Sequence, residues 1–280
     1  MFATSPESSS FPIVTMAAVA TRAEYKEAVS TLSELQERRA YECRLTPDRA
    51  LETIEHAAAF VRDRGLLTRT TDCALPSLHE ACHEEPYKPG AGGFAEWPAT
   101  KWPWGFELAR RDDVHAVKIH RGKTLFLSAE ASALADPVCR SELARMEAAD
   151  EDWTALLRHL GNMGPSLTED ILRELDLKPK ELKAMRYPLE RCGAVVARFF
   201  QADDDWVTEL ARWDQIHPQA STSGGLDELV VAGVRAAVVC PEREPRRWFS
   251  WTWLWHDGLI ERLVDEHRLT RPEPGWLAAS

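Results

Sequence analysis

The chain lacks several features that would place it in a class of protein at once. Its 280 residues contain no apolar run that approaches the about 20 residues needed to cross a bilayer. The net charge is −11, which excludes a protein that coats DNA without specificity, because such proteins bind mainly by neutralising phosphates. No cysteines stand at the C-x₂-C spacing of structural zinc sites, and there is no Gly-x-x-x-x-Gly-Lys phosphate loop. We therefore expect no membrane segment, no cofactor and no metal.

Targeting and disulfide patterns are also absent. Residues 1–20 hold a short apolar run without a basic segment before it, so we predict a disordered tail and not a signal peptide. The six cysteines lie far apart, which is typical of free thiols in a reducing compartment. These features predict a cytoplasmic protein, or a nuclear one in a eukaryote, that is not secreted.

The strongest local pattern lies in residues 151–219. Apolar residues recur at helical spacing in three successive segments. Ser166 followed by Glu169 predicts a capping box, with a helix that starts at Leu167. The β-branched and aromatic run 194–200 predicts a strand that returns after an acidic turn. Three helices followed by a two-stranded hairpin predict a winged helix.

The flanking regions predict smaller elements around this winged helix. Residues 21–150 predict helices over 22–39 and from about 46 to 65, a hairpin over 114–127, and a helical connector that breaks at Pro137. After a Ser/Gly linker, residues 220–280 predict a second, reduced winged helix. The fold class is therefore mainly α with small β-hairpins (α+β), built from tandem winged-helix domains. The core positions that we predict are Leu156, Ile171, Leu182, Leu226, Leu259 and Leu263.

Candidate nucleic-acid contacts fall on the third helix and on the hairpin. Residues 178–191 carry five Lys and Arg against two Glu, at the place of a DNA-reading helix. Pro188 inside this helix costs about 3 kcal/mol, and 151–219 as a whole carry nine Lys and Arg against thirteen Asp and Glu, so a packing helix is the alternative. The basic tip of the hairpin is expected to be exposed, with a solvated turn as the alternative. The candidate residues are Lys118, His120, Arg121, Lys123, Lys178, Lys180, Lys183 and Arg186.

Two further groups of side chains could bind ligands, and packing is the preferred interpretation of both. The first group has side chains that can bind metals but lacks a ligand pair of the C-x₂-C type, so we expect packed thiols and surface histidines. Its members are Cys73, His79, Cys82 and His83. The second consists of tryptophans that we expect to cover or fill the core, with a ligand cage or base stacking as the alternative: Trp97, Trp102, Trp104, Trp248, Trp251, Trp253 and Trp255.

Four phrases carry a resemblance to a known family. They are AFVRDRGLL (59–67), LPSLHEA (75–81), HRGKTLFLS (120–128) and GPSLTEDILRELDL (164–177). In this order, with a Trp-rich step before the third, they resemble the AlkZ-related group, winged-helix proteins similar to the AlkZ-type DNA glycosylases. The resemblance covers roughly residues 45–277 and implies tandem winged helices around a concave surface that faces DNA.

We carry over no catalytic residue from those glycosylases. The resemblance implies a Gln-x-Gln or Gln-x-Asp motif, and the only glutamines are Gln36, Gln201, Gln215 and Gln219. Gln36 has Arg38 where a second Gln or Asp would be needed, and Gln215 and Gln219 are four positions apart instead of two. Gln201 and Asp203 have the Gln-x-Asp spacing, but they lie at the acidic turn that we interpret as a solvated wing tip. Three hypotheses therefore stand: a DNA-associated winged-helix protein connected with DNA repair, without an identifiable catalytic residue; a glycosylase-like hydrolase acting on alkylated or crosslinked DNA; and a structural or small-molecule-binding module that does not bind DNA.

Overall fold

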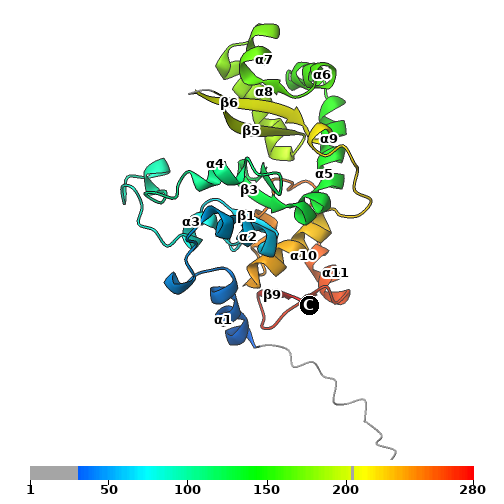
Figure 1. Ribbon diagram of the computed structural model, residues 1–280. Helices are drawn as coiled ribbons and strands as arrows, with labels where there is room; N and C mark the ends of the chain where they lie inside the picture. Colours follow the sequence, from blue (N-terminus) through cyan, green and yellow to red (C-terminus); the bar gives the residue numbers. More distant parts are fainter. Residues whose placement is uncertain (1–30, 203–204) are drawn as a thin grey trace, which may run out of the picture. The chain divides into compact units, whose positions relative to one another are not determined.

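The computed structural model describes residues 31–202 and 205–280 (Figure 1). Residues Thr31–Ser280 belong to one compact unit. The unit is of the α+β class, with helices and small antiparallel sheets, which confirms the predicted class. The predicted tail at 1–20 lies outside the described residues.

The strands form small three-stranded sheets that share one topology. The first contains β1 (Leu66–Thr68), β2 (Val114–His120) and β3 (Lys123–Ser128); the second β4 (Ser166–Leu167), β5 (Val195–Ala202) and β6 (Asp205–Arg212); the third β7 (Val239–Pro241), β8 (Leu269–Thr270) and β9 (Trp276–Ala279). Their orders are β1-β3-β2, β4-β6-β5 and β7-β9-β8. In each sheet the last strand is central and pairs with both others, so the second strand is always an edge strand. The hairpin predicted at 114–127 is confirmed as β2 and β3.

The helices follow a repeating order around these sheets. They are α1 (Leu32–Glu42), α2 (Ile54–Arg64), α3 (Leu78–Ala81), α4 (Trp104–Leu108), α5 (Ala129–Glu147), α6 (Trp153–Met163), α7 (Thr168–Glu174), α8 (Pro179–Cys192), α9 (Trp213–Ile216), α10 (Leu226–Ala237) and α11 (Leu259–Asp265). One helix precedes each first strand (α2, α6 and α10), and one or two α-helices lie between the first and second strands. This order occurs in 54–128, in 153–212 and, with one α-helix fewer, in 226–279.

The buried side chains form more than one core. The middle segment has its own core around Leu156, Ile171 and Leu182. The largest core joins β2 and β3 to α10, α11 and the third sheet, and it encloses Trp213 and Trp248. The six core positions predicted from the sequence are all buried. The N-terminal and C-terminal segments therefore stabilise each other, because they bury apolar side chains against each other.

The helix predicted over 46–65 is divided in the structure. Pro47–Arg49 forms a single 3-10 turn, and α2 begins only at Ile54, where the side chain of Thr53 caps it. Leu51 between them is fully buried, and its N–H donates to the carbonyl of Ala81 at 2.8 Å. This tertiary bond replaces a helical one, so the single-helix prediction was wrong. Of the helix predicted over 22–39, the described part begins at Leu32, and residues 22–30 lie outside the described residues.

Ser166 is a strand residue and not a helix cap. It pairs with Leu210 in β4 and β6, its hydroxyl donates to the carbonyl of Gly164, and α7 starts after it at Thr168. The capping box predicted there was wrong because pairing with a distant strand fixes an extended backbone at this position.

Pro137 lies inside α5 without ending it. A proline cannot donate to the carbonyl four residues earlier, and its ring crowds the preceding turn. Leu134, in that turn, accepts a hydrogen bond from the N–H of Gly225 at 2.9 Å. The helix therefore continues where the sequence predicted a break, and a residue of another segment binds the backbone of the turn before Pro137.

Candidate nucleic-acid interface

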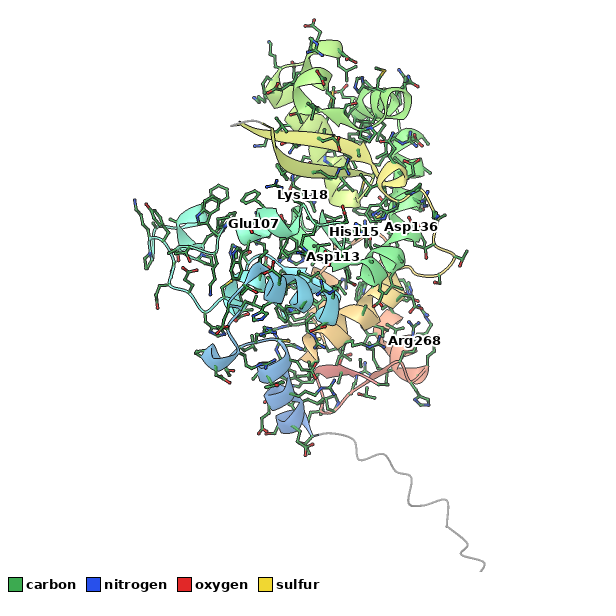
Figure 2. All side chains as sticks on the ribbon, in the orientation of Figure 1. Glu107, Asp113, His115, Lys118, Asp136 and Arg268 are labelled. Carbon is green, nitrogen blue, oxygen red and sulfur yellow. The ribbon has the colours of Figure 1, made fainter. Side chains whose placement is uncertain are left out.

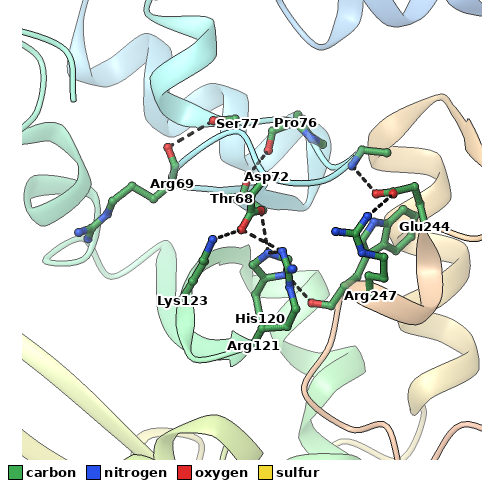
Figure 3. A network of polar contacts seen from close by, with 12 residues as sticks. Thr68, Arg69, Asp72, Pro76, Ser77, His120, Arg121, Lys123, Glu244 and Arg247 are labelled. Atoms are coloured by element: carbon green, nitrogen blue, oxygen red, sulfur yellow. Dashed lines mark hydrogen bonds and ion pairs between the residues drawn. The ribbon is translucent and has the colours of Figure 1, made fainter. Parts of the chain in front are cut away.

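The cations at the tip of the β2–β3 hairpin are mostly covered. The side chain of His120 is 1% exposed, against 26% for Lys118, 32% for Arg121 and 54% for Lys123. The expectation of an exposed tip was therefore wrong for His120. The reason is Asp72, in the loop after β1, which binds the tip from the side (Figure 3).

Asp72 accepts hydrogen bonds from three side chains of the hairpin. Oδ2 accepts from Arg121 Nη2 at 2.9 Å and from Lys123 Nζ at 2.5 Å, and Oδ1 lies 3.0 Å from His120 Nε2. Burial raises the pKa of the Asp72 carboxyl, but the hydrogen bonds of Lys123 and His120 and the nearby positive charges outweigh it, so the pKa lies below its ordinary value. The carboxylate thus stays ionised and neutralises part of the hairpin's positive charge.

Lys118 and Arg186 both point to the buried carboxylate of Glu190. Lys118 Nζ lies 2.6 Å from Glu190 Oε2, and Arg186 Nε lies 3.2 Å from Oε1. Glu190 is 4% exposed. Lys118 therefore attaches the hairpin to α8, Arg186 forms an ion pair within α8, and neither cation is available as a free charge on the surface.

The outer face of α8 is exposed and cationic. The helix begins where Pro179 occupies the first position and Glu181 accepts the backbone N–H of Lys178 at 2.7 Å. Leu182 and Leu189 are buried on its inner face. At helical spacing on the other face lie Lys180, Lys183, Tyr187 and Arg191, which we call the α8 stripe; Arg191 is half-buried and the others are exposed.

The α8 stripe continues onto the hairpin tip. A methyl group built at Gly122 would stand 3.3 Å from the Tyr187 ring and 3.4 Å from Cγ of Arg191. In the described part of the chain, no ion pair involves Lys178, Lys180 or Lys183. The structure therefore brings the two predicted groups of basic residues together, and it leaves the lysines of α8 and Lys123 as their most exposed members.

A cavity between the first and second sheets was not predicted. It measures about 510 Å³ and lies between the edge strands β2 and β5, with Arg110, His115, Arg198 and His217 among its lining residues. Figure 2 labels His115 on β2. The rings of His115 and His217 are 4.8 Å apart. Burial lowers the pKa of His217 to about 4 and also lowers that of His115, so both are neutral at pH 7. No local motif could indicate this pair, because the two residues lie in segments that meet only in the folded chain.

The tryptophans divide into buried and exposed groups. Trp248 and Trp251 are fully buried, which confirms the predicted core role, but Trp253 is 51% exposed. Trp97 and Trp102 line an open apolar cavity of about 360 Å³ that also includes the exposed rings of Tyr87 and Phe94. Trp104 packs against the core as expected, whereas Trp97 and Trp102 border this open cavity.

Two of the glutamines, Gln36 and Gln215, have different surroundings. Gln36 is exposed on α1. Gln215 donates from Nε2 to the carbonyl of Leu160 at 2.6 Å, and its Oε1 accepts the N–H of Arg212 at 2.9 Å. Both polar atoms of the Gln215 amide are thus engaged within the fold.

Comparisons of the chain with protein-family models, with curated proteins and with solved structures gave no match. Among the described residues, no helix is both long enough and apolar enough to cross a membrane.

Proposed function

We propose that the protein binds duplex DNA through winged-helix units, with α8 as the helix that enters the groove. The order α6, β4, α7, α8, β5, β6, with the first strand paired to the last, supports a winged helix in residues 151–219. The same order in 220–280, with one α-helix fewer, supports the reduced second unit, and its recurrence in 54–128 supports a further unit. In such units the helix before the hairpin contacts the major groove, and the hairpin contacts the backbone.

The observation that carries the proposal is the α8 stripe. Lys180 and Lys183 are exposed and lie one turn apart on the helix that such a unit presents to DNA. Arg191 and the hairpin tip with Lys123 extend the same surface. Lysines that are free of carboxylates can neutralise phosphates without first breaking an ion pair. Of the eight candidate contacts, Lys118 and Arg186 are left out of the interface because Glu190 binds them.

The charge of the whole chain sets the expected strength of binding. With a net charge of −11, the chain as a whole repels DNA, so binding depends on a local basic patch. A patch of about four cations releases about four counterions, so the logarithm of affinity should fall against the logarithm of salt concentration with a slope of about −3 to −4. We therefore expect weak binding that is lost at high salt.

The test is a fluorescence-anisotropy titration of a labelled duplex at several salt concentrations. We expect Lys180→Ala/Lys183→Ala to weaken binding and to reduce the magnitude of the salt slope by about 2, because each lysine is expected to neutralise one phosphate. The matched control is Arg38→Ala/Lys88→Ala, which removes the same charge from exposed positions on α1 and in the loop before α4. Equal affinities and slopes for the two double variants would exclude α8 from the interface.

A further inference from the structure

Three side chains of metal-ligand type converge beside the hairpin tip. They are Asp72 and Cys73, which follow β1, and His120 at the end of β2, and their ligand atoms all lie within 4.8 Å of one another. The sequence did not indicate this group, because its candidates around Cys73 were His79, Cys82 and His83, and Asp72 and His120 meet only through the fold. The close-up in Figure 3 shows Asp72 and His120 side by side.

A backbone carbonyl fixes the orientation of the His120 ring. Nδ1 lies 2.5 Å from the carbonyl oxygen of Trp248, which can only accept, so Nδ1 carries a proton and donates it. The other ring nitrogen, Nε2, is directed at the hairpin tip and lies 3.1 Å from Nη2 of Arg121.

Nε2 of His120 also faces Asp72. It lies 3.0 Å from Oδ1, so either a proton or a metal ion can bridge the imidazole and the carboxylate. Oδ2 of the same carboxylate already accepts from Arg121 and Lys123, whereas Oδ1 is directed at His120. The carboxylate and the imidazole therefore lie close enough to bind the same metal ion.

We propose that Asp72, Cys73 and His120 bind a zinc ion with one open coordination position. Mixed nitrogen, oxygen and sulfur ligands favour zinc over magnesium or calcium, which prefer oxygen alone. A metal-binding imidazole usually donates its other N–H to a carbonyl or carboxylate, as His120 does to Trp248. Ligand atoms of tetrahedral zinc stand roughly 3.3–3.8 Å apart for bonds of about 2.0–2.3 Å, so zinc would draw the three residues slightly closer.

The charges balance when the ion binds. Burial raises the pKa of the Cys73 thiol to about 12, so without metal the sulfur keeps its proton. As the zinc–sulfur bond forms, Sγ releases this proton to the solvent, and the carboxylate and thiolate together neutralise the two charges of the ion. Arg121 gives up its contact with Nε2 and remains with Lys123 on Oδ2. These two cations next to the open position favour an anionic fourth ligand, such as hydroxide or a phosphate oxygen.

The experiment uses the full chain, stripped with a chelator and then titrated with zinc and with cobalt as a spectroscopic substitute. We expect one equivalent of zinc in calorimetry, release of one proton for each zinc, and a thiolate-to-cobalt charge-transfer band. We expect the band to be lost in Cys73→Ser and kept in Cys82→Ser, which changes a buried thiol outside the group.

Two results would overturn the site. The first is that the stripped chain binds no zinc in the titration. The second is that Cys73→Ser gives the same cobalt band as the wild type. Circular dichroism shows whether Cys73→Ser is folded. If it is not, Asp72→Asn replaces it, with an expected affinity for cobalt at least tenfold lower and a thiolate band still present at saturation; an unchanged affinity counts against the site. The assay contains no DNA, so its outcome is independent of the proposed binding to duplex DNA.

Discussion

Tyr187 of α8 lies against Gly122 at the tip of the β2–β3 hairpin, with its ring 3.3 Å from where a methyl group on Gly122 would stand. Gly122 has a φ of +80°, which side chains other than glycine rarely adopt. The contact joins the two groups of basic residues into one surface. Two features therefore favour glycine at position 122: the positive φ of the turn, and the close approach of the Tyr187 ring.

Gly122→Ala should lower the free energy of unfolding by more than Gly90→Ala. Gly90 has nearly the same φ, +78°, but nothing lies within 4 Å of a methyl group there. Both substitutions cost about 1 kcal/mol of backbone strain, so the excess in Gly122→Ala measures the contact with α8. Urea unfolding of the two variants tests this. Equal losses of unfolding free energy would mean that the hairpin and α8 can move apart without a cost in stability.

Glu190→Gln should destabilise the fold by about 2 kcal/mol, because a buried carboxylate that binds Lys118 and Arg186 is replaced by a neutral amide. The matched control is Glu209→Gln, which removes a carboxylate whose partner Arg198 is 47% exposed and which should cost less than about 1 kcal/mol. Thermal or urea unfolding compares them. If Glu190→Gln lowers the free energy of unfolding no more than its control, the ion pairs of Lys118 and Arg186 with Glu190 do not stabilise the fold.

Asp72→Asn should increase the affinity for duplex DNA. The carboxylate neutralises Arg121 and Lys123, and its removal frees up to two cations, which should steepen the salt slope by up to about 2. Asp113→Asn is the control, because Asp113 also binds two cations, Arg62 at 2.6 Å and Arg111 at 2.8 Å, but lies outside the hairpin tip. Anisotropy titrations of both variants without added metal provide the comparison, and an equal gain in both would indicate a general effect of net charge.

The stability of the protein should fall as the pH decreases from about 6.5 to about 4. Burial lowers the pKa of His79 and of His217 from 6.5 to about 4. In this window the unfolded chain binds protons at both residues and the folded chain does not, so acid favours unfolding, by about 1.4 kcal/mol per pH unit for each histidine at most. Chemical unfolding at pH 7 and pH 4.5 measures the loss. We expect His79→Asn/His217→Asn to reduce the pH dependence, and an unchanged dependence in this variant would assign it to other groups.

Local patterns in the sequence were sufficient to predict several elements of the fold. Leu156, Ile171 and Leu182 are buried as predicted, since apolar spacing within one helix decides which face turns inward. The hairpin over 114–128 follows equally from its own alternation around a tight turn. In each case the residues that decide the structure are close neighbours in the chain.

The tertiary structure decided which charged and polar groups remain free. His120 is buried because Asp72 and the carbonyl of Trp248, both distant in sequence, bind its two ring nitrogens. Ser166 joined a strand because Leu210 pairs with it. Side-chain periodicity is a property of the local backbone and can be read from the sequence. The partner of a charge or of a backbone N–H depends on which distant segments the shared cores bring together, and no short stretch of sequence contains that information.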